Sequence, residues 1–215
     1  MAVAYYVLTD MKSARGGVRG RPREFDADKA LDAAMRVFWE KGYDGASLSD
    51  LTKAMGISKP SMYLSLGNKE ALFDKAMERY AEMRAELLRE SFTAVTVREG
   101  INRLLCAAVE MFTDHKNPRG CLANQGLSSC STGSPGLRRD VEQMRDSFEL
   151  ALKERFDFAQ ETGELDSHVS TKDLARYYSV VFQGLGLQAK GGGTRRELLR
   201  IVDLAIKSGP LREAA

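Results

Sequence analysis

The sequence is poor in the residues and motifs that mark secreted, membrane-spanning and many enzymatic proteins. Its 215 residues include only three cysteines and five prolines, and three thiols are too few for a disulfide-stapled secreted fold. No stretch has the roughly 18 consecutive apolar residues that a membrane-spanning helix needs. The opening MAVAYYVLTD lacks the apolar segment and cleavage site of an export signal. These absences predict a cytoplasmic protein with no membrane partner.

Familiar catalytic and cofactor-binding motifs are also missing. The sequence contains no G-x-S-x-G, G-x-G-x-x-G or Walker-type loop, which are the patterns of a nucleophile elbow or a phosphate cradle. His115 and His168 are widely separated and lack cysteine or carboxylate partners at the spacing of zinc ligands. We therefore predict that the chain is not an enzyme and holds neither a cofactor nor a metal.

The net charge of +2 conceals an uneven distribution. Residues 11–69 carry 11 basic and 7 acidic side chains, a net charge of +4, whereas residues 70–215 sum to −1. This asymmetry indicates a polyanion-binding end on a nearly neutral body. The stretch MKSARGGVRGRPR has no apolar periodicity and predicts a flexible basic arm over residues 1–23. Such an arm can follow DNA through Arg21 and Arg23 or serve as a plain solubilising terminus.

The segment after the arm has the pattern of a helix-turn-helix. A first helix can begin at Asp26, and a short second helix can begin at the capping residue Ser47. Gly56 permits the positive φ of a tight turn. Ser58 can cap a third helix that tolerates Pro60 in its first turn. Two short helices joined by a glycine turn are typical of a DNA-reading motif, whose second helix enters the major groove.

Residues Gly20 to Phe73 resemble the N-terminal domain of the tetracycline-repressor (TetR) family of bacterial transcription regulators. The matching stretches are GRPREFD and ALDAAMRVFWEKGYDGASLSDLTKAMGISKPSMYLSLGNKEALF. The chain departs from many relatives at Leu64-Ser65-Leu66, where they carry a histidine and a phenylalanine. Leu66 is expected to pack as that phenylalanine does, whereas Ser65 need not replace the contacts of the histidine.

The resemblance implies an all-α protein of about nine helices in two domains. The expected DNA-binding domain covers 24–72, and the ligand-binding and dimerisation domain covers 73–210. The remaining sequence agrees with this, because its periodicity stays helical and nowhere alternates as strands do. Expected helices run from Asn68 to about Phe92 and then over 97–115, 119–131, 136–161, 171–189 and 194–208.

The residue types near the turn predict how the motif contacts DNA. The Lys59 ammonium can donate to guanine, and nearby hydroxyls can bond base edges or phosphates. Ser47 and Lys69 lie at helix N-termini, where the helix dipole favours an anion. The family resemblance implies that the Tyr63 hydroxyl reaches a phosphate. The candidate DNA-binding residues are Arg21, Arg23, Ser47, Ser58, Lys59, Pro60, Ser61, Tyr63 and Lys69, with Pro60 more suited to shaping the helix than to base contact.

The segment DLARYYSVVFQGLGLQAK is apolar around much of its circumference, as expected of a helix buried by its own domain and by a partner. The resemblance implies that the last two major helices form a homodimer, which would read a palindromic operator. Candidate interface residues are Tyr178, Val181, Phe182, Leu185, Leu198 and Val202. An entirely intramolecular core is the alternative for this stretch.

A small-molecule effector pocket is expected in the middle of the C-terminal domain. Its candidate lining residues are Met111, Phe112, Leu122, Met144, Phe148, Phe156 and Tyr177, although methionines and aromatics at helical spacing are also typical of plain core. The predicted function is repression that ends when the effector alters the separation of the two recognition helices. That separation must match successive major grooves, about 34–36 Å apart.

Cys121 raises an alternative function, redox or electrophile sensing by a thiol. Arg119 and nearby helix amides would favour its reactive thiolate form. Cys121 and Cys130 would be about 14 Å apart along a straight helix, so a disulfide between them would require that helix to unfold. Buried, inert thiols are the competing interpretation.

Overall fold

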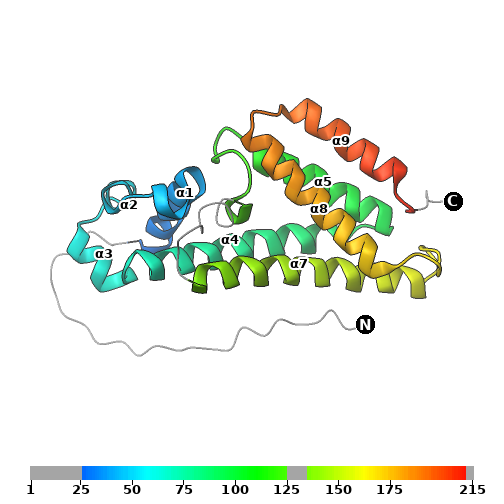
Figure 1. Ribbon diagram of the computed structural model, residues 1–215, viewed down its shortest axis with the longest axis horizontal. Coiled ribbons are helices and arrows are strands. Elements are labelled where there is room, and N and C mark those ends of the chain that lie inside the picture. Colours follow the sequence, from blue (N-terminus) through cyan, green and yellow to red (C-terminus); the bar gives the residue numbers. More distant parts are fainter. Residues whose placement is uncertain (1–25, 125–134, 212–215) are drawn as a thin grey trace.

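The computed structural model describes residues 26–124 and 135–211, apart from the side chains at 135–138 and 140. All regular structure in these residues is α-helical, which confirms the expected all-α fold (Figure 1). The predicted arm, with Arg21 and Arg23, and the segment that contains Cys130 lie outside the described residues. The helices are α1 (Ala27–Gly45), α2 (Leu48–Met55), α3 (Lys59–Leu66), α4 (Lys69–Ser91), α5 (Val97–Thr113), α7 (Pro135–Glu161), α8 (Thr171–Lys190) and α9 (Arg195–Ser208).

Capping residues set the helix boundaries around the turn, as the sequence predicts. The Ser47 side chain accepts a hydrogen bond from the Asp50 amide, and the Asp50 carboxylate accepts one from the Ser47 amide. Gly56 ends α2 with φ 67°, a conformation that favours glycine. The Ser58 hydroxyl accepts from the Ser61 amide at 3.2 Å. The turn between α2 and α3 is therefore determined by local chemistry.

A compact apolar core holds α1, α2 and α3 together at one end of the molecule. Phe38 and Trp39 of α1 are fully buried, and the Phe38 ring meets the Phe73 ring of α4 edge-on at 4.9 Å. Met62 and Leu66 anchor α3, and the burial of Leu66 confirms its expected packing role. Because α4 contributes Phe73 to this core and then continues into the second domain, it connects the two domains (Figure 1).

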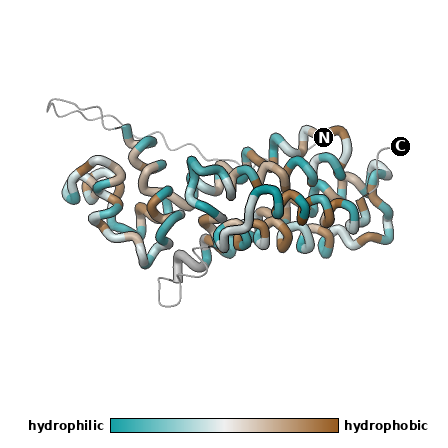
Figure 2. Tube along the Cα trace, turned by 90° about the horizontal axis from the view of Figure 1, so that it is seen from above, coloured by the Kyte–Doolittle hydropathy of each residue, from teal (hydrophilic) through white to brown (hydrophobic). Residues whose placement is uncertain are grey.

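The C-terminal domain is a bundle in which α7 lies along α4 and α8 packs against α5 and α7. Helix α9 covers the outer side of α5 and α8. Seen from above, apolar and polar stretches alternate along these helices (Figure 2), as expected when each helix buries one face. No helix in the described ranges is long and apolar enough to span a membrane.

The expected helix at 119–131 begins later than predicted. Residues 114–121 form a non-helical loop, and helical structure starts only at Leu122 before the description stops at residue 124. Gly120 adopts φ 88°, and its amide donates to the Phe112 carbonyl at 3.1 Å. A positive φ lies outside the right-handed helical region, so the expected helix cannot include Gly120. Sequence periodicity does not predict this conformation. The preceding helix, expected to reach residue 115, ends at Thr113.

Candidate nucleic-acid interface and effector region

Helix α3 presents a face of mostly polar side chains to solvent. Lys59, Pro60 and Ser61 are exposed in its first turn, and Tyr63 has 49% of its surface accessible. Met62 and Leu66 point the other way, into the core. The structure thus brings the predicted residues of α3 together on the side of the helix that is free to enter a groove.

Leu64 is a candidate DNA-contacting residue that the sequence prediction missed. It is 89% exposed, although leucine is among the residues most often buried. It lies two positions from both Met62 and Leu66, which places it on the opposite face of the helix. An apolar side chain there can contact the methyl group of thymine. The spacing from the two buried residues was the signal that could have identified it.

The N-terminus of α2 differs from the phosphate site predicted at Ser47. The Ser47 hydroxyl donates to the Asp50 carboxylate at 2.7 Å, and Lys41 Nζ lies 2.9 Å from the same carboxylate. Hydrogen bonds from Lys41 and then Ser47 lower the Asp50 pKa from 3.8 to about 2. Ser47 therefore acts as the cap of α2, and a phosphate contact at this helix N-terminus stays a prediction.

Lys69 begins α4 on the same side of the domain as Tyr43. Its Nζ lies 4.5 Å from the centroid of the Tyr43 ring, a cation–π contact that positions the charge. The structure thus assigns Lys69 a packing contact in addition to its predicted place at a helix N-terminus.

The predicted effector-pocket residues do not form one group. Phe112, Leu122 and Phe148 are buried in the C-terminal core, and Met144 packs against it. Met111 instead helps to line a separate surface pocket of about 380 Å³ beside Arg195. Tyr177 is 40% exposed on the outer side of α8. Phe156 is also fully buried. Met111 and Tyr177 thus lie apart from the other predicted lining residues.

Most of the predicted dimer-interface side chains belong to the core of a single protomer. Tyr178, Phe182, Leu185, Leu198 and Val202 are all buried within the chain, and Val181 is half-buried. These side chains fill the contacts of α8 with α5, α7 and α9, so the five buried ones are not available to a partner. The residues predicted for the interface therefore lie mostly on the inward faces of α8 and α9.

The 114–121 loop connects the first domain to α8. The Trp39 indole donates to the Gly120 carbonyl at 2.8 Å, and Arg36 donates to the Lys116 carbonyl at 2.8 Å. On the opposite side, Arg119 Nε donates to the Ala189 carbonyl at 2.9 Å. Hydrogen bonds of the loop therefore link α8 to α1.

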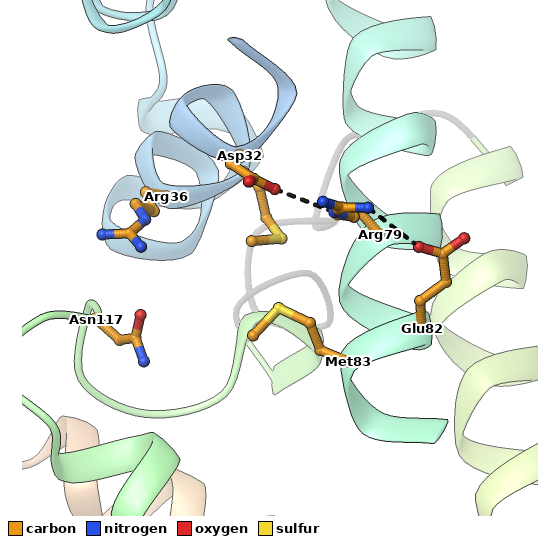
Figure 3. A pocket seen from close by; sticks show the side chains of 7 residues that line it. Asp32, Arg36, Arg79, Glu82, Met83 and Asn117 are labelled. Carbon is orange, nitrogen blue, oxygen red and sulfur yellow. Dashed lines mark hydrogen bonds and ion pairs between the residues drawn. The ribbon is translucent and has the colours of Figure 1, made fainter. Parts of the chain in front are cut away.

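A pocket of about 290 Å³ lies at this junction (Figure 3). Its lining residues are Asp32, Met35, Arg36, Arg79, Glu82, Met83 and Asn117. Arg79 Nε lies 3.1 Å from the Asp32 carboxylate and thereby joins α1 to α4. A change in the angle between these two helices would alter both the pocket and the ion pair.

Cys121 is the last residue of the same loop and is buried. The Tyr80 hydroxyl donates to Cys121 Sγ at 3.2 Å. Burial raises the pKa of Tyr80 well above its usual value, so the hydroxyl retains its proton. Arg119, predicted to activate the thiol, instead donates to the Ala189 and Gly193 carbonyls. The polar neighbour of the Cys121 sulfur is therefore Tyr80, and not Arg119 as predicted.

A short turn between α2 and an exposed α3, with a second helical domain attached through α4, defines a helix-turn-helix DNA-binding protein. Comparisons with known proteins identify its family. Residues 30–76 match the family model described as bacterial regulatory proteins, tetR family. The HTH-type transcriptional repressor ComR of Escherichia coli (strain K12) is 30% identical over 95% of this chain and 98% of its own. The chain belongs to the TetR family of transcriptional regulators and is not an enzyme.

Other relatives and solved structures agree with this assignment. The uncharacterized HTH-type transcriptional regulator YezE of Bacillus subtilis (strain 168) is 30% identical over 87% of this chain and 97% of its own. A cysteine mutant of the TetR family transcriptional regulator CifR, complexed with 26-bp double-strand operator DNA, has a TM-score of 0.81 and 38% identity. That match covers 89% of this chain and 100% of CifR.

Proposed function

We propose that this protein is a transcriptional repressor that binds a palindromic operator as a homodimer and is released by a small-molecule effector. The observation that carries the proposal is the exposed face of α3. Lys59, Ser61 and Tyr63 lie on this face, and the other side of the helix is buried in the core. The relative ComR is named a repressor, and CifR was solved with operator DNA. Because the proposed partner is chromosomal DNA, the site of action is the cytoplasm.

An apolar stripe on α8 and α9 supports the proposed homodimer. Val180 and Leu187 of α8 and Leu204 of α9 are each more than 60% exposed. Tyr177 and Ile201 extend the stripe. Exposed apolar side chains on two helices that pack together suit a protein–protein contact, and two copies of this helix pair would form a four-helix interface. We propose this outward face in place of the buried residues predicted from sequence.

The proposed release mechanism uses the links between the two domains. An effector bound among α4, α5, α7 and α8 would favour one arrangement of α8 and the 114–121 loop. The Trp39–Gly120 hydrogen bond and the Asp32–Arg79 ion pair would transmit that preference to α1. In a dimer, a small rotation of each first domain changes the separation of the two α3 helices, which must remain about 34–36 Å to fit DNA.

Selection of DNA from a random pool by the purified protein tests the proposed function. We expect enrichment of a palindrome, with an affinity that falls steeply as salt rises because phosphate contacts release counterions. Lys59→Ala should weaken binding to the selected sequence by about 10-fold or more. The control variant Lys172→Ala removes an exposed lysine of α8. It makes the same change in charge and should bind the selected sequence normally. Failure to enrich any sequence, or equal affinities for these two variants, would contradict the proposed DNA face.

We propose thiol sensing as a second candidate function because Cys121 lies at a crowded point. A Cβ added to Gly186 of α8 would meet Cys121 Cβ at 2.8 Å, and the adjacent Gly120 carbonyl binds Trp39. Addition of the Cys121 thiol across an activated C=C bond forms an S–C bond, breaks the π bond and transfers the thiol proton to the neighbouring carbon. The added group would have to displace α8 or the loop.

N-ethylmaleimide tests this second function. Modification at Cys121 should release the wild-type protein from its selected operator, and Cys121→Ser should remain bound. Cys106→Ser provides the control for the half-buried thiol on α5. Mass spectrometry should place the adduct on Cys121. Release that persists in Cys121→Ser, or an adduct on Cys121 that leaves operator affinity unchanged, would exclude this mechanism.

A further inference from the structure

Arg84 is a buried cation for which the described structure provides no hydrogen-bond or ionic partner. Its side chain projects from α4 into the C-terminal domain, and the residue is only 6% exposed. Its Nε is buried without an acceptor, and no described carboxylate lies within ion-pair distance of the guanidinium. A buried charge without a partner opposes folding, so its presence requires an explanation.

The carboxylates nearest to Arg84 along the chain are paired with other residues. Glu82 lies 3.6 Å from Arg79, and Glu86 pairs with Arg89. On α7, the Glu149 carboxylate lies 3.2 Å from Arg176 of α8. Within the described residues, Arg84 therefore lacks an ionic partner although acidic residues lie nearby in the chain, because these three carboxylates pair with other arginines.

Two aromatic rings surround the guanidinium. Its central carbon lies 4.6 Å from the centroid of the Phe148 ring and 4.9 Å from that of Phe182. Phe112 meets Phe182 edge-on at 5.3 Å, which extends the apolar wall. Such rings attract the cation, but they do not replace the planar oxygen acceptors that its N–H groups require.

We propose that Arg84 is the anion-binding residue of the effector pocket and that the effector is a small apolar molecule bearing a carboxylate. The forked donors of a guanidinium match the two oxygens of a carboxylate, and the rings of Phe112, Phe148 and Phe182 suit an apolar body. Arg84 lies one helical turn from Tyr80 on the same face of α4. Tyr80 contacts Trp39 edge-on at 4.9 Å, so an occupied site lies close to the connection between the domains. The proposal specifies the effector class for the release function proposed above.

Calorimetric titration of the intact protein with benzoate and octanoate tests the proposal, with benzamide and octanamide as neutral analogues. At constant ionic strength, at least one carboxylate should bind the wild-type protein at least about 10-fold more tightly than its amide. At 100 times the dissociation constant it should raise the Tm by about 5–10 °C. If neither carboxylate binds, or if the amides bind equally well, the proposal is overturned.

Variants of α4 assign the effect to Arg84. Arg84→Gln should weaken carboxylate binding by at least about 10-fold, whereas Arg89→Gln, an exposed arginine on the same helix, should leave it unchanged. Equal binding by wild type and Arg84→Gln would overturn the proposal. If Arg84→Gln does not fold, Arg84→Lys serves instead, because it keeps the charge but loses the forked geometry. Arg84→Lys should bind the carboxylate more weakly, and unchanged affinity would overturn the bidentate site.

Stability distinguishes a ligand-binding arginine from a structural one. Arg84→Met removes the unpaired charge and leaves a side chain that packs well on aromatic rings, so its Tm without ligand should equal or exceed that of the wild type. A lower Tm would show that Arg84 is retained for its ring contacts and would overturn the proposal.

DNA binding separates this proposal from the proposed function. Arg84→Gln without ligand should bind the selected operator normally. Carboxylate binding by a protein that enriches no DNA sequence would refute only the repressor function, and operator binding without carboxylate binding would refute only the effector class.

Discussion

Single residues of α3 divide between holding the helix and facing outward. Met62 is fully buried. The Ser61 hydroxyl shares a hydrogen bond with the Ser58 hydroxyl, and the Ser65 hydroxyl donates to the Ser61 carbonyl. Tyr63 and Leu64 have no comparable structural role, since about half or more of each side chain is exposed. Changes at these two positions should therefore alter DNA binding with little effect on folding.

Tyr63→Phe should weaken operator binding by about 10-fold, because it removes a hydroxyl that can donate to a phosphate. Its Tm should remain that of the wild type, since the ring is unchanged and the hydroxyl has no essential partner in the fold. Fluorescence anisotropy with the selected operator measures the affinity, and calorimetry measures the Tm. Unchanged affinity would remove Tyr63 from the DNA face.

Asp50→Asn should destabilise the protein in a pH-dependent manner. The folded-state pKa of Asp50 is about 2, below the usual 3.8, so its stabilising effect is complete above the usual value and is lost as pH falls from about 4 toward 2. The Tm difference between wild type and variant should be constant near neutral pH and should shrink over that range. Asp44→Asn, an exposed aspartate on α1, is the control and should show no such difference at any pH.

At the scale of secondary-structure elements, the decisive feature is the close contact between the 114–121 loop and α8. A Cβ at Gly120 would lie 2.8 Å from the Gly186 carbonyl, and a Cβ at Gly186 would lie 2.8 Å from Cys121 Cβ. Two glycines thus allow a loop and a helix to meet at backbone distance. Their separation along the chain, 66 positions, explains why no local pattern predicts the contact.

Gly186→Ala should destabilise the protein by about 1–3 kcal/mol, because its methyl group cannot be accommodated without moving α8 or the loop. The Cβ of Gly191→Ala, at the end of the same helix, would lie an ordinary 3.5 Å from the Gln188 carbonyl oxygen, and this variant should change stability by less than about 0.5 kcal/mol. Urea unfolding followed by circular dichroism compares the two. Equal stabilities would show that the close contact is absent.

At the scale of the whole molecule, one outer face remains apolar after the chain has folded. Val180 and Leu187 on α8 and Leu204 on α9 are exposed although the protomer core is complete without them. A homodimer that uses this face would leave both α3 helices, at the far end of the molecule (Figure 1), directed toward DNA. The shape of the protomer is therefore compatible with reading two half-sites.

The double variant Leu187→Glu/Leu204→Glu should convert the protein to a monomer, because it buries like charges in the proposed interface. Operator affinity should fall by about 100-fold or more when the two half-sites are no longer bound by one particle. Val95→Glu, at a site 87% exposed between α4 and α5, should leave both properties unchanged. Analytical ultracentrifugation reports the oligomeric state, and a dimeric double variant would place the interface elsewhere.

The amino-acid sequence alone determined what depends on near neighbours in the chain. Capping by Ser47 and Ser58, the left-handed turn at Gly56 and the amphipathic helices all follow from residues within a few positions of one another. The family resemblance also lies in this local pattern. The helix-turn-helix was therefore predictable before the structure was known.

Only the tertiary structure decided which face of α8 lies inward, where the 114–121 loop contacts it, and that Arg84 is buried. Phe182 and Val180 are both apolar residues of the same helix, yet one is fully buried and the other 61% exposed. In the sequence, nothing distinguishes Arg84 from other charged residues, and only the structure places Phe148 and Phe182 around it. These properties depend on contacts between segments distant in the chain, whose geometry is set by the packing of the whole bundle and not by local preference.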